Sequence, residues 1–585
     1  RRSWPSTAER WTARPSSAWR PSSSTNSSRV GGGSQEHSSA PQGGADVVGR
    51  HRRLGLRTAL ISSLTLVSRL LGYVREVLAA ALFGDRSAVY DAFITAWRVP
   101  NLFRRFLGEG ALSTSFQTAL TRTDGDLGEE AGRRLFQDTA RLLTAVLLGL
   151  ALGVMALVAL MPDAMPITGW RWLGADPAPV RDLTVRVMPF VVIVCLSALA
   201  AGALQVRGYF AAPSWAPAAM NLVWIGVLVG LVVQFGVGQA EQDSADMARH
   251  VQMTRILAWG VLAGGVVQLA VQVPALRRAG FLGVAPPPPA GAPDAWGVLR
   301  RSAPLALGAA VYQINVMLDG LMAEGLLPDG GPTLHYYANR VQQFPMALVA
   351  VAATSAVFPA LQAHGHRGDR RAVRDLHDRT HRAIAFIALP AALGLAVLAG
   401  PVISVSFERG AFGAEGVARA SAGLRMLTLA ILPAGATGLV ARTYYAMGDF
   451  RWPVVVSVAM LVSNVVLNVL LIEGLHMDVD GLALATAITS WGGLALLLPG
   501  LRTRLELPRG REPSLGPLAL MTLAALASAG ASLAVHSAVS TSVGRGLALL
   551  AAIACGVIVY GGVAILLQIP EARTSLARLR RRGRS

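Results

Sequence analysis

Long apolar runs, separated by short polar turns, follow one another from residue 56 to residue 568. Each run holds roughly 20 residues, the length that an α-helix needs to cross about 30 Å of hydrocarbon. The pattern predicts an all-α polytopic membrane protein with about fourteen transmembrane helices. The predicted helices cover 56–83, 88–120, 135–161, 182–207, 215–237, 254–276, 298–325, 334–361, 381–407, 418–447, 452–474, 480–501, 514–537 and 543–568.

Arginine gathers in alternate turns between these runs, for example at 122–134, 367–379 and 502–511. Because cytoplasmic loops of membrane proteins carry an excess of basic residues, these turns are expected inside the cell. An even number of spans then places both termini in the cytoplasm. The chain is therefore expected in the bacterial cytoplasmic (inner) membrane, as a multi-pass protein.

A weak internal repeat divides the predicted helices into two halves. The segment 110–116, at the end of the second helix, is similar to 352–358, at the end of the eighth. A shift of six helices preserves topology, which is typical of parallel repeats in transporters. The expected parts are a disordered basic cytoplasmic extension at 1–53, an N-terminal lobe of helices 1–6 at 54–276, a cytoplasmic linker at 277–297, a C-terminal lobe of helices 7–12 at 298–501, two further helices at 514–568 and a basic cytoplasmic tail at 569–585.

Composition narrows the class of protein. Of the 585 residues 53% are hydrophobic and 15% are charged, the net charge is +19, and no Lys occurs in the chain. A Walker A loop needs Gly-Lys-Ser/Thr, so an ATP-driven pump of that type is excluded. Arginines that flank apolar runs orient membrane segments, which argues against nucleic-acid binding. Cys195 and Cys555 lie in apolar runs, and they indicate neither a disulfide framework nor a zinc site.

Ionisable residues inside apolar runs are the most informative feature, because a charge at mid-membrane is costly and usually faces a cavity or a partner. In the first helix, Arg69 and Glu76 are seven residues apart and share a face, whereas Arg75 projects roughly 120° away from Arg69. In the eighth helix, Arg340 follows a Tyr-Tyr-Ala-Asn sequence. An arginine-lined cavity would attract a polyanion.

The second helix repeats this pattern around Pro100, which is expected to kink or break it. Asp91, Arg98 and Arg105 are spaced by seven residues and Glu109 follows Arg105 by four, so all four are expected on one face. Two interpretations stay open for the arginines of both helices. They line a substrate cavity, or they reach the interface and pair with the nearby acids.

A second polar set lies in the predicted C-terminal lobe. One acid, two amides and a hydroxyl fall in helices seven, eleven and twelve: Asp319, Asn464, Asn468 and Thr486. Carboxylate, amide and hydroxyl oxygens suit a hard cation such as sodium. The alternative is ordinary interhelical hydrogen bonding.

One notable segment runs from Ser68 through Asp91-Ala-Phe to 98–113, and a second is Tyr336-Tyr-Ala-Asn-Arg340 followed by Phe-Pro. Both closely resemble motifs of the MurJ (MviN) lipid II flippases. These flippases belong to the multidrug/oligosaccharidyl-lipid/polysaccharide exporter superfamily. The resemblance implies two six-helix lobes around a central cavity, and a groove for the polyprenyl tail formed by the last two helices. The chain departs from the family at two positions: Asp is common where Asn339 stands and possible where Asn468 stands. The change at Asn468 leaves sodium dependence open.

The resemblance implies that the family's functional groups fall on Arg69, Arg75, Arg105 and Arg340, with Glu76, Asp91 and Glu109 as matching acids. It also implies that Asp319, Asn464, Asn468 and Thr486 correspond to a sodium site found in some members. The expected function is a flippase, and not an enzyme, that moves lipid II to the outer leaflet for peptidoglycan synthesis. Expected partners are lipid II, membrane lipids and the cell-wall synthesis machinery, with no nucleic acid, and the chain is expected to be a monomer.

Four alternative functions make different demands on the sequence. A related exporter of another polyprenyl-linked oligosaccharide would share the arginines. A cation-coupled drug antiporter should prefer acids in its cavity. An integral-membrane phosphatase or glycosyltransferase would need clustered catalytic His or Asp at a membrane face. A scaffold of a cell-wall complex would not depend on the arginines.

Overall fold

The computed structural model describes residues 43–105, 111–162, 176–237, 244–285, 287, 293–354, 357–505 and 515–574. Its contacts divide the chain into two compact units, Arg1–Leu56 and Arg57–Ser585. The interactions reported below lie within the second unit. Most of the extension expected at 1–53, part of the expected linker at 277–297 and most of the expected tail at 569–585 lie outside the described residues.

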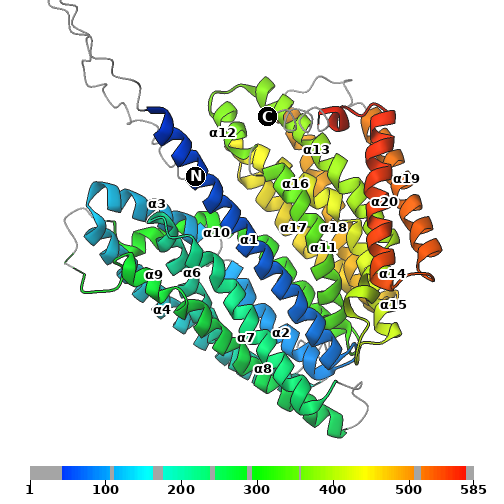
Figure 1. The fold of residues 1–585 in the computed structure, drawn as a ribbon, viewed down its shortest axis with the longest axis horizontal. Coiled ribbons are helices and arrows are strands. Elements are labelled where there is room, and N and C mark those ends of the chain that lie inside the picture. Colours follow the sequence, from blue (N-terminus) through cyan, green and yellow to red (C-terminus); the bar gives the residue numbers. More distant parts are fainter. Residues whose placement is uncertain are drawn as a thin grey trace, which may run out of the picture. The chain divides into compact units, whose positions relative to one another are not determined.

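Within these ranges the structure holds helices and turns and no strand (Figure 1). In chain order the helices are α1 (Gly43–Phe83), α2 (Ala88–Phe103), α3 (Ala111–Asp126), α4 (Glu129–Leu160), α5 (Pro177–Val187), α6 (Phe190–Val206), α7 (Ala211–Phe235), α8 (Ser244–Ala270), α9 (Val273–Arg278), α10 (Ala295–Leu326), α11 (Gly331–Thr354), α12 (Phe358–His366), α13 (Arg370–Val397), α14 (Ala399–Phe407), α15 (Ala414–Thr428), α16 (Ile431–Ala446), α17 (Arg451–Val469) with the π-helical turn η2 (Leu470–Gly474), α18 (Val479–Arg504), α19 (Leu515–Val539) and α20 (Arg545–Leu566). The predicted all-α class is confirmed.

Ten segments of the described chain are long and apolar enough to cross a membrane. The helices that carry Arg75, Arg98 and Arg340 are not among these segments. Helix α2 has only 16 residues, and polar side chains interrupt the apolar runs of α1 and α11. The count of about fourteen spans therefore stays a prediction.

Several predicted spans are built from two helices. The span expected at 182–207 is α5 followed by α6, with the break beside Pro189, which has no N–H to donate to the helix. The span expected at 418–447 is α15 followed by α16, and the one at 88–120 is α2 followed by α3. Proline and charged residues near the breaks were visible in the sequence, but the positions of the helix ends were not.

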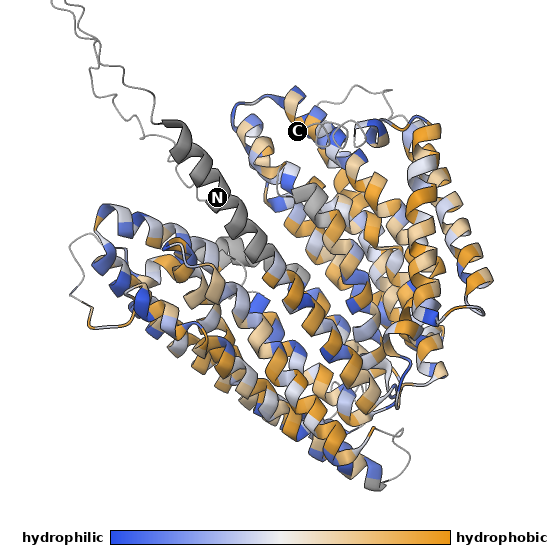
Figure 2. Cartoon of the chain, viewed as in Figure 1, coloured by the Kyte–Doolittle hydropathy of each residue, from blue (hydrophilic) through white to orange (hydrophobic). Residues whose placement is uncertain are grey.

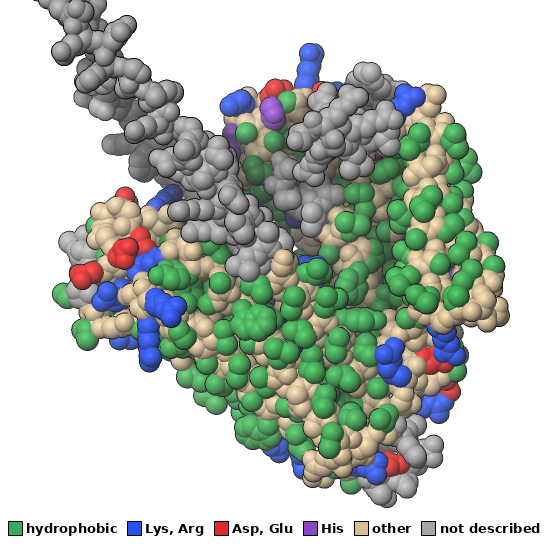
Figure 3. All heavy atoms as spheres, viewed as in Figure 1, with side chains coloured by type: hydrophobic (Ala, Val, Ile, Leu, Met, Phe, Trp, Pro, Cys, Tyr) green, Lys and Arg blue, Asp and Glu red, His purple; other side chains and the backbone are tan. Residues whose placement is uncertain are grey.

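Apolar side chains cover the outside of the helices. In α4, Leu152, Leu157 and Leu160 are more than 60% exposed, and in α20 Val557 and Leu566 are about 70–80% exposed. Figures 2 and 3 show the same arrangement, with apolar residues over the middle of the visible face and charged side chains nearer its ends. An outer surface of this kind is stable when it faces lipid.

The helices pack into two groups, named here for their order in the chain. The N-terminal group is α2–α9, in which α7 packs on α8, α2 on α5 and α3 on α6; the C-terminal group is α11–α18, in which α18 contacts α15, α16 and α17. Helix α10 contacts both groups, through α2 and α3 on one side and α17 on the other. The pair α19 and α20 lies against α13 (Figure 1).

Small residues allow the last two helices to approach closely. The hydroxyl of Ser528 in α19 donates to the backbone oxygen of Gly556 in α20 at 2.7 Å, and a Cβ on Gly556 would lie 2.2 Å from the Ser532 hydroxyl oxygen. Tyr560 of α20 then donates to the backbone oxygen of Phe386 in α13 at 2.7 Å. Small side chains and interhelical hydrogen bonds of this kind hold helices together in lipid.

Candidate functional site

A cavity of about 480 Å³ lies where α1, α2, α6, α7 and α11 meet. Its walls combine apolar residues such as Phe190 and Phe344 with a dense polar set. The polar lining residues are Ser68, Arg69, Tyr73, Arg75, Glu76, Asn101, Arg104, Asn221, Gln268, Arg340 and Gln343. Four of these described residues are arginines and one is a glutamate, which gives this part of the lining a net charge of +3.

Glu76 is the centre of the hydrogen-bond network in this cavity. Its carboxylate, 5% exposed, accepts from Arg75 at 2.5 Å, from the Tyr336 hydroxyl at 2.9 Å and from Arg340 at 3.3 Å. Arg75 and Glu76 belong to α1, whereas Tyr336 and Arg340 belong to α11. The single acid therefore ties α1 to the C-terminal group and lowers the repulsion between two arginines.

Arg75 is held on three sides. Besides Glu76, its guanidinium donates to the side-chain oxygen of Asn221 at 3.2 Å and lies 4.1 Å from the ring centroid of Trp224. Asn221 is itself fixed by a bond to the backbone oxygen of Ser68 at 3.1 Å. A cation over a Trp face is stabilised by the ring quadrupole, so the position of Arg75 is set before any ligand arrives.

Arg340 and Arg69 are more accessible. The side chain of Arg340 is 35% exposed, donates to Gln343 at 3.3 Å and lies 5.5 Å from the ring centroid of Tyr336. Arg69 lines the same cavity as Arg75, although the two project from different faces of α1. The cavity therefore extends around α1, and both side chains line it although they were predicted on different faces of the helix.

Two neighbouring arginines directly after α2 differ in their position relative to the cavity, and the predicted one is not the one that lines it. Arg104 lines the cavity and donates to the Asn101 side chain at 2.9 Å, whereas Arg105 is half-buried and does not line it. The sequence prediction counted seven residues from Arg98 along a regular helix. Trp97, Asn101 and Arg104 line the cavity at spacings of four and three residues, which is one face of a regular helix. Asp91 and Arg98 instead lie on the face that meets α11.

Asp91 does not line the cavity, among whose residues it was predicted, although it shares with Arg98 the face of α2 that meets α11, as expected. It is 3% exposed and accepts from the backbone N–H groups of Gly330 at 2.6 Å and Thr333 at 3.0 Å. These donors belong to the first turn of α11, whose partial positive charge favours a carboxylate. Asp91 therefore joins α2 to the C-terminal group. Glu109 lies outside the described residues.

Further contacts join the segment 81–86 to the C-terminal group. Ala411 N–H donates to the backbone oxygen of Ala81 at 3.0 Å, Gly413 N–H donates to Asp85 at 3.4 Å, and Arg86 forms an ion pair with Glu415. At Gly330, φ is +84° and a Cβ would lie 1.7 Å from the backbone oxygen of Asp85. We call this set, together with Asp91 and its two donors, the closed end.

The predicted cation ligands come together between α10, α17 and α18. Asp319, 5% exposed, accepts from Asn468 at 3.2 Å and from the Thr486 hydroxyl at 3.4 Å, and Asn468 also donates to the side-chain oxygen of Asn464 at 3.1 Å. Asn315 donates to the second oxygen of Asp319 at 3.3 Å.

These residues fit a monovalent hard cation. The side-chain oxygen of Asn468 is buried and has no hydrogen-bond partner. Turning that amide over would point its oxygen at the oxygens of Asp319 and Asn464, an arrangement that needs a cation between them. The described residues hold no group of three or more His, Cys, Asp and Glu suited to a metal. With one carboxylate, a single positive charge makes the site neutral.

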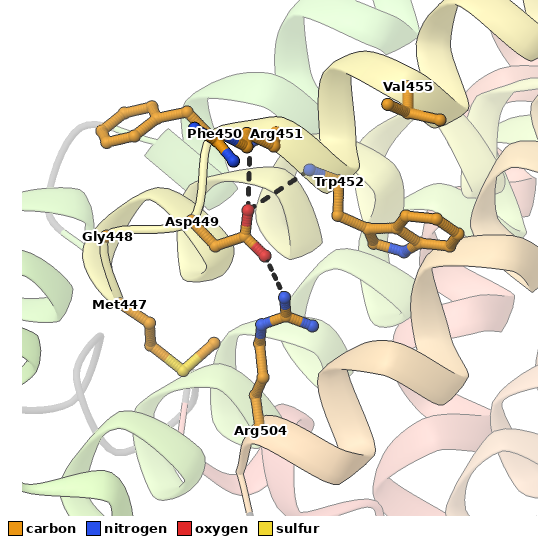
Figure 4. Close-up of a pocket in the computed structure, with 8 residues that line it drawn as sticks. All are labelled: Met447, Gly448, Asp449, Phe450, Arg451, Trp452, Val455 and Arg504. Atoms are coloured by element: carbon orange, nitrogen blue, oxygen red, sulfur yellow. Dashed lines mark hydrogen bonds and ion pairs between the residues drawn. The ribbon is translucent and has the colours of Figure 1, made fainter. Parts of the chain in front are cut away.

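A second hollow, of about 570 Å³, lies at the turn between α16 and α17 (Figure 4). Asp449 accepts from the N–H groups of Arg451 at 3.0 Å and Trp452 at 3.2 Å, and its other oxygen pairs with Arg504 of α18. These bonds cap the N-terminus of α17 and fix the turn to α18. The hollow shares no lining residue with the central cavity.

Sequence reasoning missed several cavity residues. Asn101, Arg104, Asn221 and Gln268 each place a polar side chain in or beside a predicted apolar run, a signal that could have selected them. Trp224 had no such signal, because an aromatic residue in a transmembrane helix is unremarkable. Its role follows only from the position of Arg75 over its ring.

The chain was compared with known proteins by sequence and by structure. It is 31% identical over 542 residues to a protein of Bdellovibrio bacteriovorus named probable lipid II flippase MurJ, covering 90% of this chain and 97% of that protein. It is 32% identical to the protein of that name in Vibrio cholerae, over 77% of this chain and 83% of the relative.

Solved structures show the same fold. A structure titled lipid II flippase MurJ, inward closed conformation, aligns with a TM-score of 0.66 at 21% identity, covering 87% of this chain and 99% of that one. An inward-facing multidrug MATE transporter of the MOP superfamily aligns with a TM-score of 0.59 at 12% identity, covering 77% and 98% of the two chains. The family model described as lipid II flippase MurJ matches residues 79–553, and the chain therefore belongs to the lipid II flippase MurJ family.

Proposed function

We propose that this inner-membrane protein moves lipid II, the undecaprenyl-diphosphate-linked peptidoglycan precursor, from the inner to the outer leaflet. The observation that carries the proposal is the central cavity, whose lining holds four arginines and one glutamate. A diphosphate carries the opposite charge, and charge-assisted hydrogen bonds from guanidinium groups to phosphate are among the strong ones. The relatives of this chain named as lipid II flippases support the same substrate.

Within the cavity, the more exposed Arg340 and Arg69 meet the head group first. Arg340 gives up part of its bond with Glu76, at 3.3 Å, for two bonds to the diphosphate. Arg75 keeps its position on Trp224 and adds charge without a rearrangement. The polyprenyl tail stays in lipid, along a groove beside α19 and α20.

Transport follows from rocking of the N-terminal group against the C-terminal group, the usual form of alternating access in transporters built from repeats. The closed end faces the periplasm in this proposal, because the turn at 84–87 follows the first helix of a chain that starts inside. Both termini then lie in the cytoplasm. We further propose that Na⁺ binds at Asp319, Asn464, Asn468 and Thr486 and couples to this motion.

Replacing the cell's own lipid II flippase with this chain tests the proposal. After depletion of the endogenous protein, an externally added probe that modifies only outer-leaflet lipid II should regain its signal when this chain is expressed. The Arg340→Ala variant should reach the membrane in normal amounts and lose that signal. The Arg255→Ala variant, which removes a half-exposed arginine paired with Asp182 at the surface, is the matched control and should keep it.

Lipid II that stays in the inner leaflet despite normal amounts of wild-type protein in the membrane would reject this substrate. Another polyprenyl-linked oligosaccharide would also carry a diphosphate. Its export would then be tested with the same Arg340→Ala variant. A drug antiporter fits less well, because a lining of net charge +3 repels the cations that such proteins export.

A further inference from the structure

Arg98 of α2 is a half-buried cation that does not line the central cavity. Its guanidinium instead donates to the backbone oxygen of Pro332, just before the Thr333 N–H that binds Asp91, at 3.2 Å. Its Nε atom is buried without a hydrogen-bond partner. Arg98 therefore belongs to the contact between α2 and the C-terminal group, one side of the closed end.

The place of the guanidinium depends on a glycine in α10. A Cβ on Gly320 would lie 2.2 Å from one terminal nitrogen of Arg98, 2.4 Å from its Cδ and 2.7 Å from its Cζ. Only a residue without a side chain lets Arg98 lie flat against the helix here. Gly320 directly follows Asp319, the one carboxylate of the proposed cation site, so the two charges interact across the helix contact.

A second acid of α10 also contacts α2. Glu324 accepts from the Thr95 hydroxyl of α2 at 2.7 Å, and its charge also interacts with Arg98. Arg98 is thus the cation that α2 brings to two carboxylates of α10. Bonds from Asn468 and Thr486 hold Asp319 to α17 and α18. If these bonds persist when α2 moves away from α11 at the closed end, Arg98 leaves with α2, and Asp319 loses a positive neighbour inside the membrane. An unpaired carboxylate at that depth is costly and attracts another cation.

We propose that Arg98 is a tethered counter-charge that competes with a free cation for Asp319, so that Na⁺ binds weakly while the closed end is shut and more tightly once it opens. The proposal rests on the cation site proposed above and adds the element that couples it to the motion. By reciprocity, Na⁺ favours opening of this end to the same extent that opening favours Na⁺. Arg98 acts here as a positioning residue and touches no substrate.

The test measures Na⁺ affinity in the full-length purified protein with the closed end locked and unlocked. Arg86→Cys and Glu415→Cys, in a background with Cys195→Ala and Cys555→Ala, replace the exposed ion pair between Arg86 and Glu415. A short reducible bis-thiosulfonate reagent bridges them. Na⁺ binding is followed by calorimetry, with choline chloride replacing NaCl to hold ionic strength constant.

Locking should weaken Na⁺ binding in the otherwise wild-type protein by roughly 5–150-fold, the usual range of coupling between two sites. In Arg98→Gln, the locked protein should bind Na⁺ as tightly as the unlocked one, whereas Arg98→Lys should retain part of the difference. Gly320→Ala tests the same point from the other helix, because it displaces the guanidinium while favouring the helix. Arg255→Gln removes a distant charge and should bind like the wild type.

Two results overturn the proposal, and they differ in what else they overturn. If locked Arg98→Gln binds Na⁺ no more tightly than locked wild type, Arg98 only fastens two helices and the cation site stands. If neither locked nor unlocked wild type binds Na⁺ better than Asp319→Asn, the cation site is wrong and the coupling with it. The flipping assay is independent of both, so the proposed substrate is judged separately.

Discussion

At the scale of single residues, one acid organises the arginines. Glu76 accepts from Arg75, Arg340 and Tyr336, and among the described residues that line the cavity it is the only acid. The carboxylate keeps positive groups close together in a buried place where they would otherwise repel one another. A substrate diphosphate can take over that role, so the cavity is charged enough to bind and is still stable when it is empty.

Replacing Glu76 by Gln should destabilise the protein. Removing one partner of a buried ion pair costs about 3–5 kcal/mol, because the remaining charges are left without compensation. The expected value lies at the lower end of that range, since Arg340 is 35% exposed and can turn to water. Thermal unfolding of the purified protein measures the change; an unaltered midpoint would mean that Glu76 contributes no net stability.

Arg104 and Arg105 form a matched pair for testing the cavity. Both are arginines in the same turn, yet only Arg104 lines the cavity. Arg104→Ala should abolish the outer-leaflet lipid II signal, and Arg105→Ala should leave at least half of it. The probe assay in the depletion strain compares the two directly at equal expression. The reverse result would restore the assignment of Arg105 made from the sequence.

At the scale of elements, the sequence predicted most of the helices but not how they end. Apolar runs identify helices because the length and hydropathy needed to cross a membrane are local properties. Whether Pro100 kinks or ends a helix depends on its neighbours in space, and so does the face of this segment that meets the cavity, which carries Arg104 and not Arg105. Asp91 was predicted among the cavity residues and instead contacts the start of α11, and the sequence could not indicate this because the donors are about 240 residues away.

The turn between α16 and α17 supplies a prediction at this scale. Asp449 caps α17 through two backbone N–H groups and pairs with Arg504. Asp449→Ala should lower stability by about 1 kcal/mol, a typical value for an N-cap. Thermal unfolding measures this, with Asp449→Asn as the variant that keeps the cap and loses the charge. Equal losses in both variants would attribute the effect to the ion pair alone.

At the scale of the whole molecule, the two helix groups meet at different places for different purposes. Glu76 and Arg340 connect α1 to the C-terminal group inside the cavity, Asp91 connects α2 to α11 at the closed end, and α10 packs on both groups. The sequence repeat suggested two halves, but it could not indicate which contacts hold them together. Such contacts join distant segments and leave no periodic signal.

Locking the closed end should stop transport. The reducible bridge between Arg86→Cys and Glu415→Cys should abolish the outer-leaflet lipid II signal, because alternating access requires this end to separate. A reducing agent should restore the signal within the same sample. Either single-cysteine variant treated with the reagent serves as the control. Full transport by the bridged protein would exclude opening at this end.

The closed end has a consequence for the energy supply of the cell. Its contacts include backbone atoms and small residues, such as Ala81 with Ala411 and Gly330 against Asp85, which leave little room for water. In the proposed transport cycle, this end has to stop protons and salt from flowing down the electrochemical gradient while the cavity admits a large charged head group from the other side. A side chain added at Gly330 would therefore do more harm than slow transport: a leaky seal would depolarise the membrane, even in cells that also hold an intact flippase.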